Sequence, residues 1–253
     1  MEKEKINTER FLDVENKKYH SIAYNYFYDS TAVNYSRESI SVNTGGKSWS
    51  CSCGDFSISA TLGHKSWSIT NGRSSVSVSS GAYSKVLTSG YATIGSITGS
   101  RSECKVKGDR SISSSTAIES SSRNNGYLAI SCTTADYSEA SNHGIWSLSA
   151  VTGYGSIASN SGDCSTSVAS FHKSKAIVEG GESVAITTGV DCAARGEVGC
   201  WLVLTEREKR RKEISPIKNI KVVKVDGKII KPNTFYILKD DKIVGVFKEL
   251  KIE

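Results

Sequence analysis

The chain is poor in proline, methionine and large apolar side chains. Its 253 residues include only two prolines, one methionine and six phenylalanines, and 38% of them are hydrophobic. A conventional core for a domain of this size needs more bulky apolar material. The charged fraction is 23% but the net charge is only +6, which is too balanced for an extended disordered chain. These shortages favour a regular fold with an interior of small residues.

Targeting features are also missing from the sequence. Residues 1–18 are charged and lack the apolar segment of a secretory signal, and no run approaches the roughly 18 apolar residues of a membrane span. The seven cysteines show no pairing pattern, which fits reduced thiols better than a disulfide framework. We therefore expect a soluble, intracellular protein without a membrane partner.

Glycine, in contrast, is abundant and regularly spaced. Of the 22 glycines, 14 share one phase of a nine-residue period, and this phase defines the first place of each unit. Twenty units fill residues 18–197, with serine at the fourth place in seventeen and serine or alanine at the sixth place in seventeen. Residues two apart lie on the same side of a strand, so these small residues share one face.

Alternate units differ at the fifth place, so the true repeat is eighteen residues. One set is almost entirely aliphatic, and the other is mixed, with Trp49, Trp67 and Lys85. The pattern predicts an all-β, two-sided β-solenoid of about ten 18-residue coils, in which glycine allows positive φ in the turns. Three regions are expected: an N-terminal cap (1–17, a short helix or irregular plug), the solenoid (18–198), and a C-terminal β cap with a basic segment (199–253).

The aliphatic column has two interpretations. Charged residues at the fifth place of the other set cannot lie in a dry interior, which favours fifth and seventh places that point outward. The column is then a flat apolar face that binds a partner. In the alternative, the two sides are inequivalent and the column is the core. The first interpretation makes these residues the candidate partner-binding set: Ile22, Ile40, Ile58, Val76, Ile94, Ile112, Ile130, Leu148 and Val184.

Two smaller patches also have functional and structural interpretations. Trp49 and Trp67, one coil apart, form either a recognition patch or a docking site for the N-terminal segment. A basic run could contact nucleic acid or an acidic protein surface, but its interleaved glutamates also fit a solvated connector. The run consists of Arg207, Lys209, Arg210, Arg211 and Lys212.

The sequence predicts neither a metal site nor catalysis. Calcium-binding nonapeptides need regular aspartates and a second glycine, whereas the four turn aspartates here are unevenly spaced. The four histidines occupy different places of the repeat and pair with no recurrent serine and aspartate. We expect no cofactor and no enzymatic activity.

The repeat and the C-terminal segment together resemble a known group of proteins. Units of the type G-x-x-S-x-A-A-T-S run into GCWLVLTE (199–206) and then VKVDGKIIKPNTFYIL (223–238). This combination is similar to an uncharacterised family of bacterial and phage proteins with serine- and alanine-rich nonapeptides. The repeat is also loosely similar to the heads of trimeric autotransporter adhesins. The family resemblance implies a cytoplasmic protein of a bacterial host and a phage or mobile-element setting, and it supplies no catalytic residues.

The leading functional hypothesis is a non-enzymatic interaction protein that presents a flat solenoid face. Its partner is expected to be a copy of itself, in a dimer or trimer, or a host or defence protein that it occludes as an inhibitor. One alternative is a nucleic-acid or nucleotide binding module that uses the basic run and the tryptophan side. A structural fibre or adhesin-like module is the other alternative.

Overall fold

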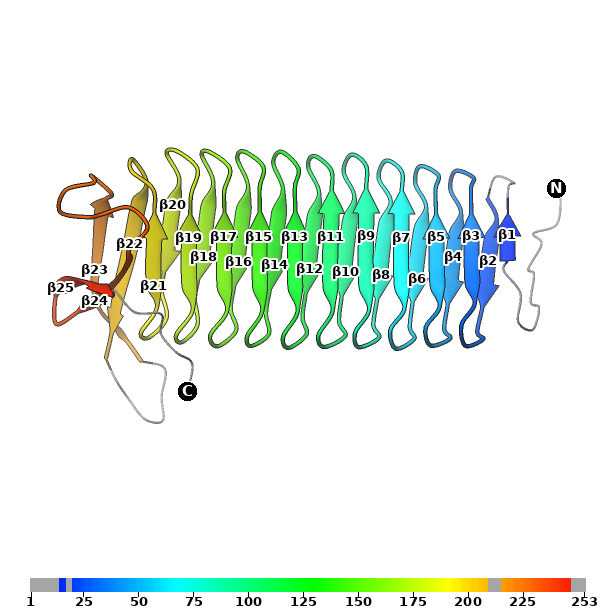
Figure 1. The fold of residues 1–253 in the computed structure, drawn as a ribbon, viewed down its shortest axis with the longest axis horizontal. Coiled ribbons are helices and arrows are strands. Elements are labelled where there is room, and N and C mark those ends of the chain that lie inside the picture. Colours follow the sequence, from blue (N-terminus) through cyan, green and yellow to red (C-terminus); the bar gives the residue numbers. More distant parts are fainter. Residues whose placement is uncertain (1–13, 17–19, 209–214, 247–253) are drawn as a thin grey trace. The chain divides into compact units, whose positions relative to one another are not determined.

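A computed structural model describes residues 14–16, 20–208 and 215–246. The chain forms two compact units, residues 1–129 (unit 1) and residues 130–253 (unit 2). The described residues form strands and turns and contain no helix. The strands recur as about ten coils of eighteen residues, which confirms the predicted all-β, two-sided solenoid (Figure 1).

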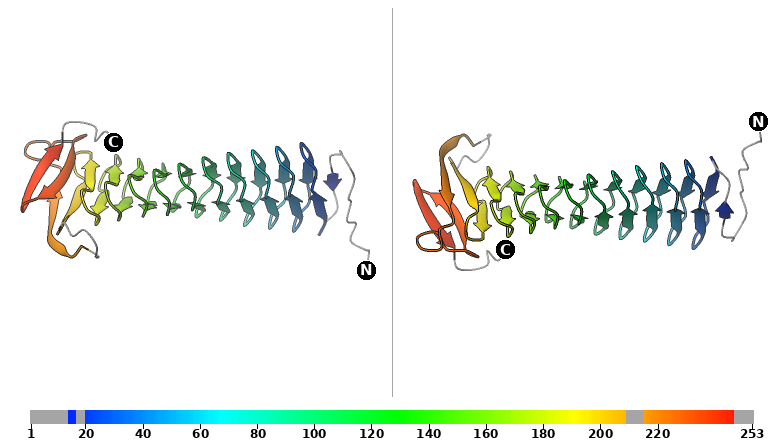
Figure 2. Two further views of the ribbon diagram at one scale, coloured as in Figure 1. Left: turned by 90° about the horizontal axis from the view of Figure 1, so that it is seen from below. Right: turned by 90° about the horizontal axis from the view of Figure 1, so that it is seen from above.

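Unit 1 consists of two parallel sheets, one of odd-numbered and one of even-numbered strands, which face each other as two thin layers (Figure 2). Each residue pairs with the one eighteen positions later, as in Ile22↔Ile40. The odd-numbered strands are β1 (Val14–Asn16), β3 (Thr31–Asn34), β5 (Trp49–Ser52), β7 (Trp67–Asn71), β9 (Lys85–Ser89), β11 (Glu103–Lys107) and β13 (Ser121–Asn124). The even-numbered strands are β2 (Ile22–Asn25), β4 (Ile40–Asn43), β6 (Ile58–Thr61), β8 (Val76–Ser79), β10 (Ile94–Ile97) and β12 (Ile112–Ser115).

Strand β1 lies within the segment predicted as an N-terminal cap. Val14 pairs with Ala32 in the same parallel register as the later coils. The repeat therefore begins one unit earlier than the sequence pattern indicated. The rest of that predicted cap, 1–13 and 17, lies outside the described residues.

Unit 2 continues the same two kinds of strand and ends in antiparallel pairs. Strand β22 pairs parallel with β20 and antiparallel with β23, while β24 pairs antiparallel with β21 and β25. One sheet has β15 (Glu139–Asn142), β17 (Ile157–Asn160), β19 (Lys175–Val178), β21 (Ala193–Gly196), β24 (Phe235–Lys239) and β25 (Lys242–Val246). The other has β14 (Ile130–Thr133), β16 (Leu148–Val151), β18 (Thr166–Ala169), β20 (Val184–Thr187), β22 (Trp201–Arg207) and β23 (Ile217–Lys224).

Burial alternates along the coil strands, with β15 and β21 as exceptions. The fourth, sixth and eighth places are buried, whereas the fifth and seventh are almost always half-buried or exposed, as in β10, where Ile94 is 42% exposed and Gly95 is buried. The aliphatic column therefore lies on the surface and is not the core. The inward eighth place went unrecognised in the sequence, although it often holds buried asparagine, such as Asn25, Asn34 and Asn43.

Five consecutive sixth-place serines of unit 1, from Ser41 to Ser77, form a chain of hydroxyls between the two sheets. Ser50 Oγ donates to Ser41 Oγ over 3.0 Å, and Ser59 Oγ donates to Ser50 Oγ over 3.0 Å. The same contact continues to Ser68 at 3.0 Å and Ser77 at 2.9 Å. Only a very small side chain fits where the sheets approach this closely, which accounts for the serine and alanine at this place.

The fourth-place serine holds each turn to the previous coil. Ser48 N–H donates to Ser66 Oγ over 3.1 Å, and Ser66 Oγ donates to the carbonyl oxygen of Gly45 over 3.1 Å. A hydroxyl can do both because it donates and accepts. Cys192 replaces serine at this place, and its thiol donates to the carbonyl oxygen of Phe171, also 21 residues earlier.

The register glycines have a different role from the one the sequence suggested. Of the described glycines in that phase, only Gly90 has a positive φ. The left-handed residue is instead the third of each unit, and it is glycine only at Gly155 among the twenty units. At the first place the constraint is steric, because a Cβ on Gly99 would lie 1.9 Å from the carbonyl oxygen of Gly81.

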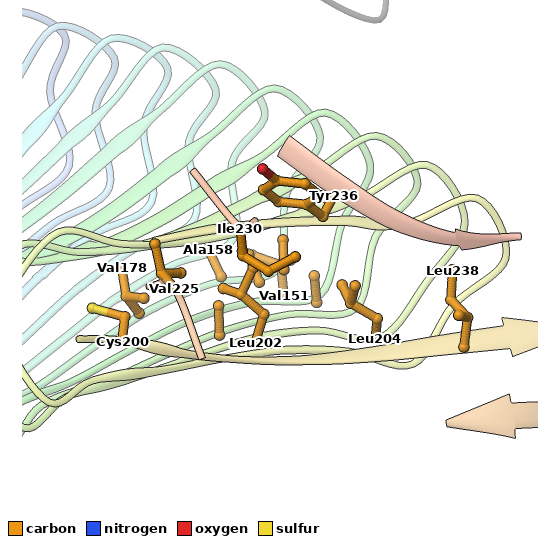
Figure 3. Close-up of a cluster of buried hydrophobic side chains, with 14 of the residues drawn as sticks. Val151, Ala158, Val178, Cys200, Leu202, Leu204, Val225, Ile230, Tyr236 and Leu238 are labelled. Carbon is orange, nitrogen blue, oxygen red and sulfur yellow. The ribbon is translucent and has the colours of Figure 1, made fainter. Parts of the chain in front are cut away.

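Larger side chains enter the interior at two places. In unit 1, the buried residues Val86, Ile97, Cys104 and Val106 form an apolar cluster, and the absence of a side chain at Gly95 makes room for Cys104 and Val106. In unit 2, a larger cluster lies at the β22–β25 end (Figure 3). Its members there include Leu202, Leu204, Val225, Ile230, Tyr236 and Leu238.

Candidate binding faces

The even-numbered strands of unit 1 present a face without charge. At the fifth place the aliphatic side chains point outward, and Ile40, Ile58, Ile94 and Ile112 are 36–42% exposed. The seventh and ninth places of these coils hold valine, alanine, serine, threonine, leucine or tyrosine. None of these three outward places in unit 1 holds Asp, Glu, Lys or Arg.

Unit 2 repeats this character on its own even-numbered strands. Ile130 is 38% exposed and Leu148 is 36% exposed, while Thr166 and Val184 are half-buried. The nine predicted partner-binding residues therefore all have outward-facing side chains. The first six of them, from Ile22 to Ile112, belong to unit 1, and the remaining three belong to unit 2.

The odd-numbered strands carry the charge instead. In unit 1, the Glu103 carboxylate lies 2.7 Å from Lys105 Nζ and 4.0 Å from both Lys85 Nζ and Arg123 Nη1. These pairs are partly exposed, so they contribute little to stability. They make the two faces of unit 1 chemically different, one charged and one not.

The predicted tryptophan patch is a closed stack. The rings of Trp49 and Trp67 lie parallel, with centroids 4.8 Å apart and planes 4° apart. Lys85 Nζ lies 4.8 Å from the Trp67 centroid on the next strand, in a cation–π contact. Trp67 is thus covered on both ring faces, whereas Trp49 stays 44% exposed. This arrangement disfavours stacking of a nucleic-acid base between the rings.

The basic run is described only at its first residue. Arg207 donates to the carbonyl oxygens of Thr188 and Ser215, the latter over 2.6 Å, so its guanidinium ties β22 to neighbouring segments of unit 2. Lys209, Arg210, Arg211 and Lys212 lie outside the described residues. The nucleic-acid hypothesis for this run stays a prediction.

The four aspartates at the second place of their units serve the stacking of the coils. Each accepts a backbone N–H from the residue eighteen positions later, at 2.6–2.9 Å. The N–H of Arg73 is the main cause of a lowered pKa at Asp55. A structural role accounts for these carboxylates: Asp55, Asp109, Asp136 and Asp163. Among the described residues, no group of three or more metal-ligating side chains converges.

A hollow of about 690 Å³ lies in unit 2 beside β22 and β24. One of its acidic residues, Glu206, accepts backbone N–H groups of Asp241 at 3.1 Å and Asp240 at 2.9 Å, as well as the side chains of Lys218 and Asn219 at 3.1 Å each. These donors, led by the Asp241 N–H, lower the pKa of Glu206 to about 2. The carboxylate therefore joins β22 to β23 and to the β24–β25 turn and has little capacity left for a ligand.

No family model, curated protein or solved structure matches this chain. Within the described part of the chain, no helix is long and apolar enough to span a membrane. What the geometry establishes is a β-solenoid with one uncharged and one charged face in unit 1.

Proposed function

We propose that the protein is a non-enzymatic binding module that self-associates through the uncharged face of its even-numbered strands. The observation that carries the proposal is the row of outward aliphatic side chains in unit 1, exposed by 36–42% at Ile40, Ile58, Ile94 and Ile112. Exposed apolar surface in a continuous patch is typical of interaction sites.

The size and shape of the face support a second copy as its occupant. At about 4.8 Å between strands and about 7 Å between alternate residues, six strands with three outward places give roughly 600 Å² in unit 1. The four even-numbered coil strands of unit 2 carry an uncharged face of their own, of roughly 400 Å² by the same spacing. A standard interface takes about 800 Å² from each partner. A flat face of parallel columns is also self-complementary about a twofold axis.

Sedimentation velocity and light scattering over the micromolar range test this proposal. The wild type is expected to sediment as a dimer or trimer. Ile94→Lys combined with Ile112→Lys should give a folded monomer, because two charges would lose their hydration in the interface. The matched control is Ser121→Lys, which adds a lysine at the same place of the coil on the charged face. It should leave the assembly unchanged.

Other outcomes separate the competing functions. A wild-type monomer would overturn self-association and leave the face for a different protein, such as a host or defence protein occluded by an inhibitor of phage or mobile-element origin. Species that grow steadily with concentration would indicate a fibre module. Salt-dependent binding of a labelled oligonucleotide at low ionic strength would favour the nucleic-acid alternative.

A further inference from the structure

Two cysteine thiols meet on the surface of unit 1. Cys51 occupies the seventh place on β5, and Cys53 occupies the ninth place directly after this strand, so both side chains leave the same side of the chain. Their sulfur atoms lie 3.6 Å apart, and both residues are half-buried, so solvent reaches them. Each is the other's only side-chain hydrogen-bond partner within the described part of the chain.

The buried cysteines are used differently. Cys192 donates its thiol to the carbonyl oxygen of Phe171 over 2.6 Å, and Cys200 donates to that of Gly180 over 3.1 Å. Cys104 packs in the apolar cluster of unit 1. These thiols bond or pack in the interior, whereas within the described part of the chain the surface pair has no backbone acceptor.

The strand geometry favours an ion between the two sulfurs over a bond between them. A disulfide needs Cβ atoms about 3.5–4.5 Å apart. Alternate residues of an extended strand are separated by roughly 6.6 Å. A linear thiolate–metal–thiolate bridge needs sulfurs about 4.6 Å apart, which is twice a metal–sulfur bond of about 2.3 Å. The sulfurs, which lie 3.6 Å apart, would have to separate by about 1 Å to reach that distance.

We propose that Cys51 and Cys53 bind one soft monovalent ion, copper(I), as a two-coordinate bis-thiolate. Thiolates select soft ions. No third histidine, cysteine or carboxylate joins them in the described residues, so the fourfold coordination that zinc prefers is not provided. On binding, both S–H bonds break, two metal–sulfur bonds form, and two protons are released to solvent for each ion. The charge of the metal does not change.

Because both thiols lose a proton on binding, the affinity of the pair for a metal should rise with pH.

Silver(I), which is stable in air and accepts the same linear geometry, is the probe. The full-length protein is titrated with silver(I) in the presence of excess glutathione, a competing single thiol, and bound silver is measured by mass spectrometry after desalting. The wild type should retain one equivalent and release two protons. Cys51→Ser and Cys53→Ser should each lose that equivalent. Serine already occupies the seventh place at Ser96 and the ninth place at Ser89, so the fold should tolerate both substitutions.

Cys164→Ser is the matched control, because Cys164 is an exposed single thiol in a turn. This variant should retain the full equivalent. The fluorescence of Trp49, two residues before Cys51, gives a second readout, since a heavy ion at the pair should quench it in the wild type and in Cys164→Ser but not in the two pair variants. Unchanged silver retention in both Cys51→Ser and Cys53→Ser would overturn the proposal. So would a wild-type protein isolated with a Cys51–Cys53 disulfide.

Discussion

The indole rings of Trp49 and Trp67 are stacked at 4.8 Å, the spacing of the strands that carry them. The parallel register of β5 and β7 places identical side chains directly above one another. The two rings can therefore stack only when the adjacent coils that carry β5 and β7 are in register.

We expect a coupling energy between these two tryptophans of about 0.5–1.5 kcal/mol. Trp49→Ala, Trp67→Ala and the double variant, compared by urea unfolding, give this value. A second cycle that joins Trp49→Ala to Tyr91→Ala, an exposed turn residue, should be additive. If the losses of stability from Trp49→Ala and Trp67→Ala were also additive, the two stacked rings would not stabilise each other and the prediction would be wrong.

Exchanges between glycine and alanine should change the stability of unit 1 in opposite directions at the first and third places of one coil. Gly99→Ala should destabilise unit 1 by about 2 kcal/mol or more, because the added Cβ overlaps the carbonyl of Gly81. Ala92→Gly should stabilise it by about 1 kcal/mol, since Ala92 has φ of 55°. Thermal unfolding of both variants measures the two effects. A neutral or stabilising Gly99→Ala would show that the close carbonyl does not constrain the first place.

The fourth-place hydroxyl should be needed for stability. Ser66→Ala removes the acceptor for Ser48 N–H and the donor to Gly45, which should cost about 1–3 kcal/mol. Ser66→Cys should cost less, because Cys192 makes the equivalent bond. Ser100→Ala, at an exposed turn position, is the control and should be nearly neutral. Chemical denaturation distinguishes the three variants.

Glu206 should make the stability of unit 2 sensitive to acid. Its pKa is lowered from 4.5 to about 2, so its stabilising effect is complete above pH 4.5 and is lost as the pH falls toward 2. Glu206→Gln should therefore lower stability at neutral pH and show a shallower loss between these pH values. Glu182→Gln, in an exposed turn, should retain the wild-type profile. Thermal unfolding as a function of pH compares them.

The sequence was sufficient for the coil length, and it favoured an outward aliphatic column without deciding against a core position. The glycine phase defines the register, and charged Lys85 and Glu103 require the fifth place of the odd-numbered strands to face water; the exposure of Ile94 then decides the matter for the even-numbered strands. The structure agrees because alternation along a strand leaves a single choice once one place is assigned.

Two features of the turns, the left-handed third place and the steric constraint on the first-place glycine, could not be predicted from the sequence pattern. The third place is left-handed whether it is Phe56, Lys65 or Leu128, so residue type gives no sign of it. The first-place glycines are constrained by a carbonyl one coil earlier. The buried eighth place was detectable, however, since Asn25, Asn34 and Asn43 already recur there.

Alternate units of nine residues belong to opposite sheets, and this limits how the gene for such a chain can change in length. Loss or duplication of eighteen residues removes or adds one whole coil, and each remaining strand keeps its side. A change of nine residues would move every later strand to the opposite sheet and bring charged residues such as Lys85 into the aliphatic column of Ile58 and Val76. Variants of different length that still associate should therefore differ by multiples of eighteen residues.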